Sequence, residues 1–345
     1  MASKDRQKTI RGSRDATVTL TLDLEDGDEL VEMISRESGL FCVSRKKILR
    51  YRSPDDVDPD LKFESATWNQ SLVLPHGASD PIVARTIIQT ARIAEIFFPK
   101  KSSKYEALSD ISWEMMHSLV SLRFIKKRLE TQVEELTDVI DRNFDAYTMG
   151  RNPKPLPIVE YLDIEFRSFA NEVRRALSVV SDLFSPLTGK DKFGQGHFHE
   201  AQMWAEKTQG ATSLLAQMLR GDQRWIKTWI DIRIAIEHPK KDTFVETMNF
   251  SLEPDGTITL PTWRFVHPNY DMARPQNLLD VMNICIENIL NFYEDLLITL
   301  LDGHLPSSIK ITFETIPEKD RDKDLPVRYR FRQYLVNKGS RPSIS

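Results

Sequence analysis

The fold is decided by residues 108–140, which read LSDISWEMMHSLVSLRFIKKRLETQVEELTDVI. Apolar residues recur in this stretch every three or four positions, at Leu108, Ile111, Met115, Leu119, Leu122, Ile125, Leu129, Val133, Leu136 and Ile140. At about 3.6 residues per turn, this period places them along one stripe of an α-helix. The stretch therefore predicts a long amphipathic helix that packs its apolar stripe against other helices.

Further helical patterns flank this stretch on both sides. Before it, Asp80-Pro81 supplies an N-cap and a proline at the first helical position. After it, the prolines of residues 152–157 end the long helix. The later apolar periods predict helices at 162–184, at about 198–220, at about 224–237 and at 278–301. We expect Ser185-Pro186 to close the first of these, and Gly221 to separate the second from the third.

Strand-like segments lie mainly outside the helical region. Residues 18–24 alternate apolar and polar side chains, and prolines then divide residues 1–80 into short segments. Residues 244–266 predict a hairpin around Pro254-Asp255-Gly256, and residues 309–313 and 327–331 also alternate. The predicted fold class is mainly α. A helical bundle at 81–303 carries the hairpin, between a strand-rich N-terminal appendage at 1–80 and a basic, strand-containing segment at 304–345.

Composition and charge exclude several classes of protein. Of 345 residues, 40% are hydrophobic and 28% are charged, which excludes disordered and collagen-like chains. The 51 acidic against 47 basic residues give a net charge of −4, so the chain is not a polycation. Cys42 and Cys285 form no C-x-x-C motif, which favours a reducing compartment. With no secretory signal at residues 1–14 and no apolar span of bilayer length, we expect a soluble, cytoplasmic protein without membrane contact.

One cation interrupts the apolar arc of the helix at 224–237. That arc comprises Trp225, Ile226, Trp229, Ile230, Ile232, Ile234 and Ile236, and its breadth predicts a helix in the middle of the bundle. Arg233 falls inside it, although burying a guanidinium without partners is costly. Glu237 could satisfy the charge as an i,i+4 partner. Pro239 removes His238 from the helix, beside Lys240 and Lys241, so the histidine could instead act together with the arginine.

The segment Arg233-Ile-Ala-Ile-Glu-His238 resembles the R-x4-6-H signature of HEPN domains, the higher eukaryote and prokaryote nucleotide-binding helical bundles. The resemblance implies a bundle of four or five helices that forms a homodimer. Active family members are metal-independent endoribonucleases without cofactors, in which two copies of the motif converge at the dimer interface. By position, Arg233 would hold the scissile RNA phosphate and His238 would transfer the proton, with Glu237, Lys240 and Lys241 in support.

Two functions therefore stay open. The first is a HEPN-like endoribonuclease that cleaves RNA through attack by the ribose 2′-hydroxyl, for example in a toxin or antiviral defence setting. The second is a non-catalytic HEPN-like bundle that binds nucleotides or proteins and dimerises, with Arg233 and Glu237 as an internal ion pair. A helical scaffold unrelated to this family is the third alternative.

A second candidate for RNA contact lies near the C-terminal end. Arg328, Arg330 and Arg332 alternate with apolar residues, so on a strand they share one face at about 6.6 Å intervals. Such a stripe suits a phosphate backbone, although charges on an edge strand also prevent aggregation.

The other motifs do not predict a metal site. Glu114 and His117 have the E-x-x-H spacing of di-iron bundles, but no second copy exists, so a solvated helix face is the better interpretation. His197, His199 and Glu200 have no companion cluster. Asp320, Asp322 and Asp324 lack the glycine and the glutamate of a calcium loop.

Overall fold

The computed structural model describes residues 24–60, 68–148, 154–190, 193, 198–270, 272, 274–302, 304 and 309–335. The strand predicted at 18–24 lies outside these residues except for Leu24. The described part is mainly helical and also contains small antiparallel sheets, which confirms the predicted fold class at this level. The described residues form two compact units, one of residues 24–92 with Thr312–Arg332 and one of Ile93–Ile311 with residues 333–335. The first unit thus joins residues from both predicted appendages.

The first unit contains a four-stranded antiparallel sheet in the order β1-β2-β3-β4. Its strands are β1 (Leu30–Arg36), β2 (Gly39–Ser44), β3 (Ile48–Arg52) and β4 (Asn69–Leu74), and the short helix α2 (Pro54–Val57) follows β3. Because side chains alternate between the faces of a sheet, Cys42, Leu49 and Tyr51 gather on one face. They form a buried cluster against which Leu24 and Leu40 pack.

The turn between β2 and β3 is held on two sides. Ser44 Oγ donates to one carboxylate oxygen of the buried Asp28 (2.7 Å), and the backbone N–H of Lys46 donates to the other (3.2 Å). On the opposite side, the N–H of Ala78 donates to the carbonyl of Ser44 (2.7 Å). This approach requires glycine at position 77, where a Cβ would lie 2.2 Å from the Ser44 carbonyl oxygen and 2.5 Å from Lys47 N.

Asp80 and Pro81 begin the helical part as predicted. The Asp80 carboxylate accepts from the N–H of Ile82 (2.9 Å) at the start of α3 (Pro81–Val83), and a π-helical turn, η1 (Ala84–Ile88), leads into α4 (Gln89–Phe97). The side-chain oxygen of Gln89 accepts from the N–H groups of Arg328 (2.8 Å) and Tyr329 (2.9 Å). These residues lead into β11 (Tyr329–Leu335), which pairs with β10 (Ile309–Thr315); the 3₁₀ turn η3 (Glu318–Asp320) lies between them.

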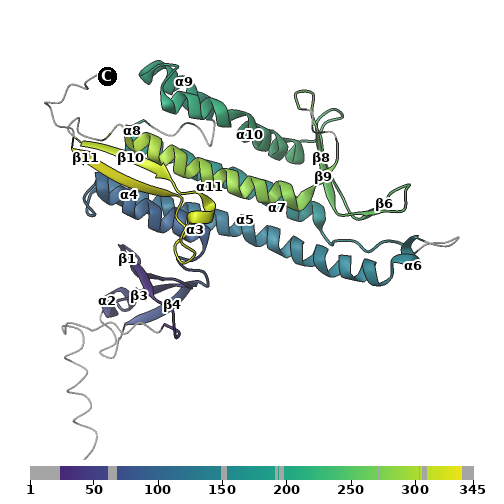
Figure 1. Ribbon diagram of the computed structural model, residues 1–345, viewed down its shortest axis with the longest axis horizontal. Helices are drawn as coiled ribbons and strands as arrows, with labels where there is room; N and C mark the ends of the chain where they lie inside the picture. Colours follow the sequence, from purple (N-terminus) through teal and green to yellow (C-terminus); the bar gives the residue numbers. More distant parts are fainter. Residues whose placement is uncertain are drawn as a thin grey trace, which may run out of the picture. The chain divides into compact units, whose positions relative to one another are not determined.

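Four long helices form the core of the second unit. They are α5 (Ser103–Arg142), α7 (Leu162–Ser181), α10 (Leu214–Glu237) and α11 (Leu278–Asp302), and they pack side by side (Figure 1). The shorter α6 (Phe144–Thr148), α8 (Phe184–Thr188) and α9 (Phe198–Gln209) complete the helices. The long helix expected around 108–140 and the helix expected at 278–301 are thereby confirmed.

Two predicted helix ends are wrong. Gly221 lies inside α10, and the break before that helix lies at Gly210, whose φ of 94° suits glycine, with Ser213 as the N-cap. A single glycine inside a well-packed helix costs only about 1 kcal/mol, which packing offsets. Likewise α7 ends at Ser181, and Pro186 lies in the first turn of α8, where a missing N–H is tolerated.

The predicted hairpin is confirmed, and its two ladders share one register. Strand β5 (Phe244–Met248) pairs with β8 (Thr262–Val266), and beyond them β6 (Ser251–Leu252) pairs with β7 (Ile258–Thr259); β9 (Gln276–Asn277) adds to β8. Trp263 of β8 is buried and stacks on Trp229 of α10, with ring centroids 6.3 Å apart. Phe166 of α7 contacts both tryptophans, so aromatic packing fixes the hairpin on the bundle.

Gly77→Ala should lower the stability of the sheet-containing unit by about 1–3 kcal/mol, because backbone atoms of the β2–β3 turn leave no room for a Cβ. Gly221→Ala is the matched control, since a Cβ there meets nothing within 4 Å and alanine favours the helix by roughly 0.5–1 kcal/mol. Thermal unfolding followed by circular dichroism measures both. Equal stability of Gly77→Ala and the wild type would contradict the close approach.

Candidate functional site

Helix α10 places the R-x4-H motif at its C-terminal end. The helix begins at the N-cap Ser213, whose side chain accepts from the N–H of Ala216, and it ends at Glu237. His238 is the C-cap and has left the helical region (φ −131°, ψ 64°), as the following Pro239 predicts. His238, Lys240 and Lys241 are all exposed. The sequence thus correctly predicted where this helix ends.

Arg233 and Glu237 form an ion pair one turn apart. Arg233 Nη2 lies 2.6 Å from Glu237 Oε1, and the two side chains are 34% and 31% exposed. Arg233 Nε is buried without a hydrogen-bond partner. The guanidinium is therefore half-buried and only in part satisfied by the carboxylate. This is the arrangement of the internal ion pair that the sequence left open as one of two alternatives.

A second arginine, Arg174 of α7, lies beside this pair. Burial lowers the pKa of Arg174, the neighbouring charge of Arg233 lowers this pKa further, and Glu237 raises it. Helices α7 and α10 pack against each other, and the charges of Arg233 and Glu237 on α10 act on Arg174 of α7. The sequence pattern does not single out Arg174. This residue adjoins Val173 of the apolar stripe of α7, and the spacing of that stripe does not show which helix packs against it.

An apolar groove of about 430 Å³ runs along α10, beside Phe198 and His199 at the start of α9. Its floor includes Ile226, Ile230 and Ile234 of α10. The helical wheel placed Ile234 in the buried arc, but its side chain is 44% exposed, because that side of α10 faces the groove rather than another helix. Neither Arg233 nor His238 is among the described residues that line the groove.

The charged groups on the rim of this groove bind one another. The Asp231 carboxylate pairs with Lys227 Nζ (2.5 Å) and accepts from the hydroxyl of Tyr270 (2.6 Å). Burial, followed by this hydrogen bond, raises the pKa of Tyr270, and the contact with Asp231 raises the pKa of Lys227. Nearby, Gln223 Nε2 lies 2.9 Å from His199 Nδ1. The rim is therefore polar and ordered, whereas the floor is apolar.

The arginine stripe near β11 has an acidic neighbour. Arg330 Nε lies 2.8 Å and Arg332 Nε 3.6 Å from the carboxylate of Glu314 on β10, and the guanidinium of Arg328 lies over the ring of Tyr329 at 5.0 Å. The carboxylate of Glu314 thus faces the two guanidiniums of Arg330 and Arg332. Together with Arg328, these four charged side chains carry a net charge of +2. The side chains of Arg330 and Arg332 are more than half exposed.

The remaining candidate ligands are dispersed. Glu114 and His117 are both exposed on α5, as expected for a solvated face, and Glu200 is exposed on α9. His197 lies outside the described residues, and Asp324 pairs with Arg45 at 3.2 Å. Among the residues that the structure describes, no three His, Cys, Asp or Glu side chains gather so that they could hold a metal ion. Cys42 and Cys285 are buried, which raises the pKa of each thiol.

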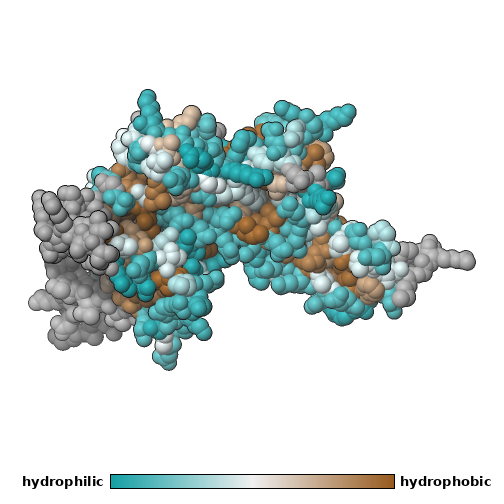
Figure 2. Space-filling view, turned by 45° about the horizontal axis from the view of Figure 1, so that its top comes forward, coloured by the Kyte–Doolittle hydropathy of each residue, from teal (hydrophilic) through white to brown (hydrophobic). Residues whose placement is uncertain are grey.

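No helix in the described part of the chain combines the length and the apolar character needed to span a lipid bilayer. The face in Figure 2 is mostly hydrophilic and carries several separate apolar patches. The chain matches no family model, no curated protein and no solved structure, so its function has to be inferred from its own residues.

Asp222→Asn should stabilise the protein at neutral pH. Burial raises the pKa of Asp222 and Asp295 of α11 raises it further, while the N–H of Trp225, 2.7 Å away, lowers it. A raised pKa in the folded state means that ionisation of Asp222 destabilises the fold as pH rises through that pKa. Asparagine keeps the acceptor for Trp225 and removes the charge.

The gain in stability of Asp222→Asn over the wild type should therefore be present at pH 7 and should vanish below the ordinary pKa of an aspartate. Denaturant unfolding of the wild type and Asp222→Asn at pH 3.5 and pH 7 measures it. An equal difference between the two proteins at both pH values would show that the carboxyl group is not the cause.

Proposed function

We propose that this protein is a HEPN-like helical bundle that works as a homodimeric, non-catalytic binding module. The observation that carries the proposal is the Arg233–Glu237 ion pair at 2.6 Å, because a carboxylate already occupies the position that an RNA phosphate would need. The packing of α5, α7, α10 and α11 agrees with the four or five helices that the resemblance implies. In this function Arg233 stabilises the end of α10, and the exposed face of that helix binds the partner.

The second copy would bind in the groove along α10. In an antiparallel pair of α10 helices centred near Ile230, the exposed Ile234 of one protomer would enter the partner's groove above the buried Ile226. Lys227 would then lie near Asp231 of the other protomer, so the rim is complementary in charge to a copy of itself. Such a self-complementary patch is what a two-fold interface requires. The exposed Ile234 would be buried there, which stabilises the dimer by about 1–2 kcal/mol per protomer.

Ile234→Glu should convert the dimer to a monomer, because it places an unpaired carboxylate in the middle of the apolar contact. Ile164→Glu is the matched control, since Ile164 is 52% exposed on α7. Analytical ultracentrifugation of the wild type and both variants measures the dissociation constant. A wild-type monomer, or equal dissociation of the two variants, would exclude the α10 interface.

A metal-independent endoribonuclease is the second candidate, favoured by Arg174 beside Arg233 and by the exposed His238 outside the helix. Two guanidiniums could hold one phosphate after Glu237 turns away. His238 could then take the proton of the ribose 2′-hydroxyl while its oxygen attacks phosphorus. The P–O5′ bond would break, and the departing 5′-oxygen would take a proton from water, leaving a 2′,3′-cyclic phosphate and a 5′-hydroxyl. Lys240 and Lys241 would add positive charge beside His238, and Arg328, Arg330 and Arg332 would form a separate candidate surface for RNA.

RNA cleavage in the presence of EDTA distinguishes the two candidates. The binding module predicts no product above background for the wild type and for Glu237→Gln, which frees Arg233. The nuclease predicts cyclic-phosphate products, a loss of at least about 100-fold in Arg233→Ala and His238→Ala, and a gain in Glu237→Gln. Lys207→Ala, on the exposed surface of α9, is the control for general loss of charge. Specific cleavage that depends on Arg233 and His238 would overturn the non-catalytic proposal.

A further inference from the structure

The sheet of the first unit has one edge that carries no charge. Its edge strands are β1 and β4, and among the described residues β4 pairs only with β3. Strand β1 carries Glu32, which pairs with Arg92 at 3.7 Å, and Arg36, whereas β4 reads NQSLVL. Proteins usually guard an edge strand with charges or proline, because its free N–H and C=O groups can pair with another strand. The unguarded edge of β4 is therefore suited to accepting an extended segment.

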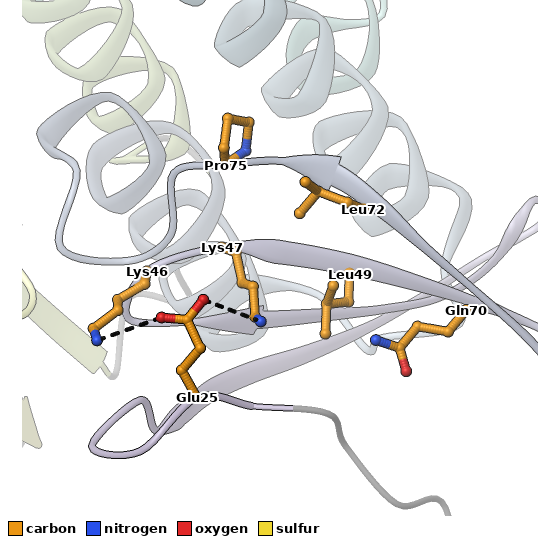
Figure 3. Close-up of a pocket in the computed structure, with 7 residues that line it drawn as sticks. All are labelled: Glu25, Lys46, Lys47, Leu49, Gln70, Leu72 and Pro75. Carbon is orange, nitrogen blue, oxygen red and sulfur yellow. Dashed lines mark ion pairs between the residues drawn. The ribbon is translucent and has the colours of Figure 1, made fainter.

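A cavity of about 620 Å³ opens on the face of the sheet beside this edge (Figure 3). Leu49 of β3 and Leu72 of β4 are register partners and form its apolar part. Leu72 is 58% exposed, although it belongs to the same row of side chains as the buried Cys42 and Leu49. An apolar side chain placed against Leu72 would continue this row and bury it.

One end of the cavity is basic. Lys46 and Lys47 of the β2–β3 turn both point toward Glu25 (Figure 3), but their ammonium nitrogens lie 3.9 and 3.8 Å from its carboxylate. These distances are too long for hydrogen bonds. The Lys47 side chain is only 19% exposed, and Glu25 gives its ammonium group no hydrogen bond. Among the residues that line the cavity, two lysines face one glutamate, so the lining carries a charge of +1 that a carboxylate could complement. The nearby Asp28 carboxylate is taken up by Ser44 Oγ and the N–H of Lys46.

The other end of the cavity presents an amide. The hydroxyl of Tyr51 donates to Gln70 Oε1 at 2.9 Å, which fixes the amide so that its NH₂ group remains for a ligand. Gln70 and Leu72 lie two residues apart on β4 and therefore share a face. Along this face the order is a hydrogen-bond donor at Gln70, an apolar surface at Leu72, and the two lysines beyond Leu74 and Pro75.

We propose that β4 and this cavity bind an extended peptide of a partner protein that carries an acidic side chain two residues before an apolar one. The peptide adds to the sheet as a fifth strand, antiparallel to β4. Its apolar side chain covers Leu72 and Leu49, and its carboxylate contacts Lys46 and Lys47. The residue two positions after the apolar one faces the amide of Gln70. The clamped β2–β3 turn holds the lysines in place before the peptide arrives, which lowers the entropy cost of binding.

Fluorescence anisotropy with the full-length protein tests the proposal. The probe is a labelled peptide, Thr-Val-Glu-Thr-Leu-Thr-Ser-Val, compared with the same peptide carrying Lys in place of Glu. We expect the Lys peptide to bind at least about tenfold more weakly, and Lys46→Glu to reverse part of this preference. Lys319→Glu, an exposed lysine of the same unit, is the control and should change nothing.

Two further comparisons separate strand addition from nonspecific attraction. Leu72→Lys should weaken binding by about tenfold or more, while Met33→Lys, on the same face at the opposite edge and 46% exposed, should not. Alternate backbone N–H groups of an added strand point toward β4 and away from it, so N-methyl groups can be placed in two phases. The phase that blocks the N–H groups facing β4 should abolish binding, and the other phase should be tolerated. Absence of peptide binding, tolerance of both N-methylation phases, or binding of an oligouridylate in place of the peptide would overturn the proposal.

Discussion

The permanent charge of Arg233 at the contact between α7 and α10 is the constraint on which the interpretation of this protein depends. A guanidinium cannot release its proton in a protein, so packing it among tryptophan and isoleucine demands a counter-charge. Glu237 provides one at a spacing of one helical turn, and Arg174 adds a second cation beside it. The end of α10 is therefore an electrostatic cluster with two positive charges and one negative charge, and any function of this helix has to accommodate it.

The aromatic contacts around Trp229 give this cluster a rigid support. Trp229 contacts Phe169 of α7 and stacks on Trp263 of the hairpin, so one side of α10 is fixed one turn before Arg233. The opposite side of the same helix, at Ile230 and Ile234, faces the groove. One helix thus combines a packed side, a charged end and an apolar surface that is free to bind. This combination suits a binding module better than a site built around a single open cleft.

The sheet of the first unit uses a different principle. Its position-specific contacts are made at the β2–β3 turn: the backbone at Gly77 approaches this turn, and the side chain of Asp28 holds it from the other side. These contacts fix Lys46 and Lys47 without neutralising them fully, and the adjacent edge of β4 keeps its backbone groups unpaired among the described residues. The two units therefore offer chemically distinct surfaces, an apolar groove with a self-complementary rim on α10 and an uncharged strand edge beside a basic cavity.

The sequence alone determined the long helices, the N-cap at Asp80, the hairpin and the exit of His238 from α10, because each depends on residues close together in the chain. It left the state of Arg233 open, since the period of a helix places a side chain on a face without saying what covers it. Only the tertiary structure decided that Arg174 lies beside Arg233, that Ile234 faces a groove, and that Gly210 rather than Gly221 breaks the helix. Those outcomes depend on packing between segments distant in sequence, which a local pattern does not contain.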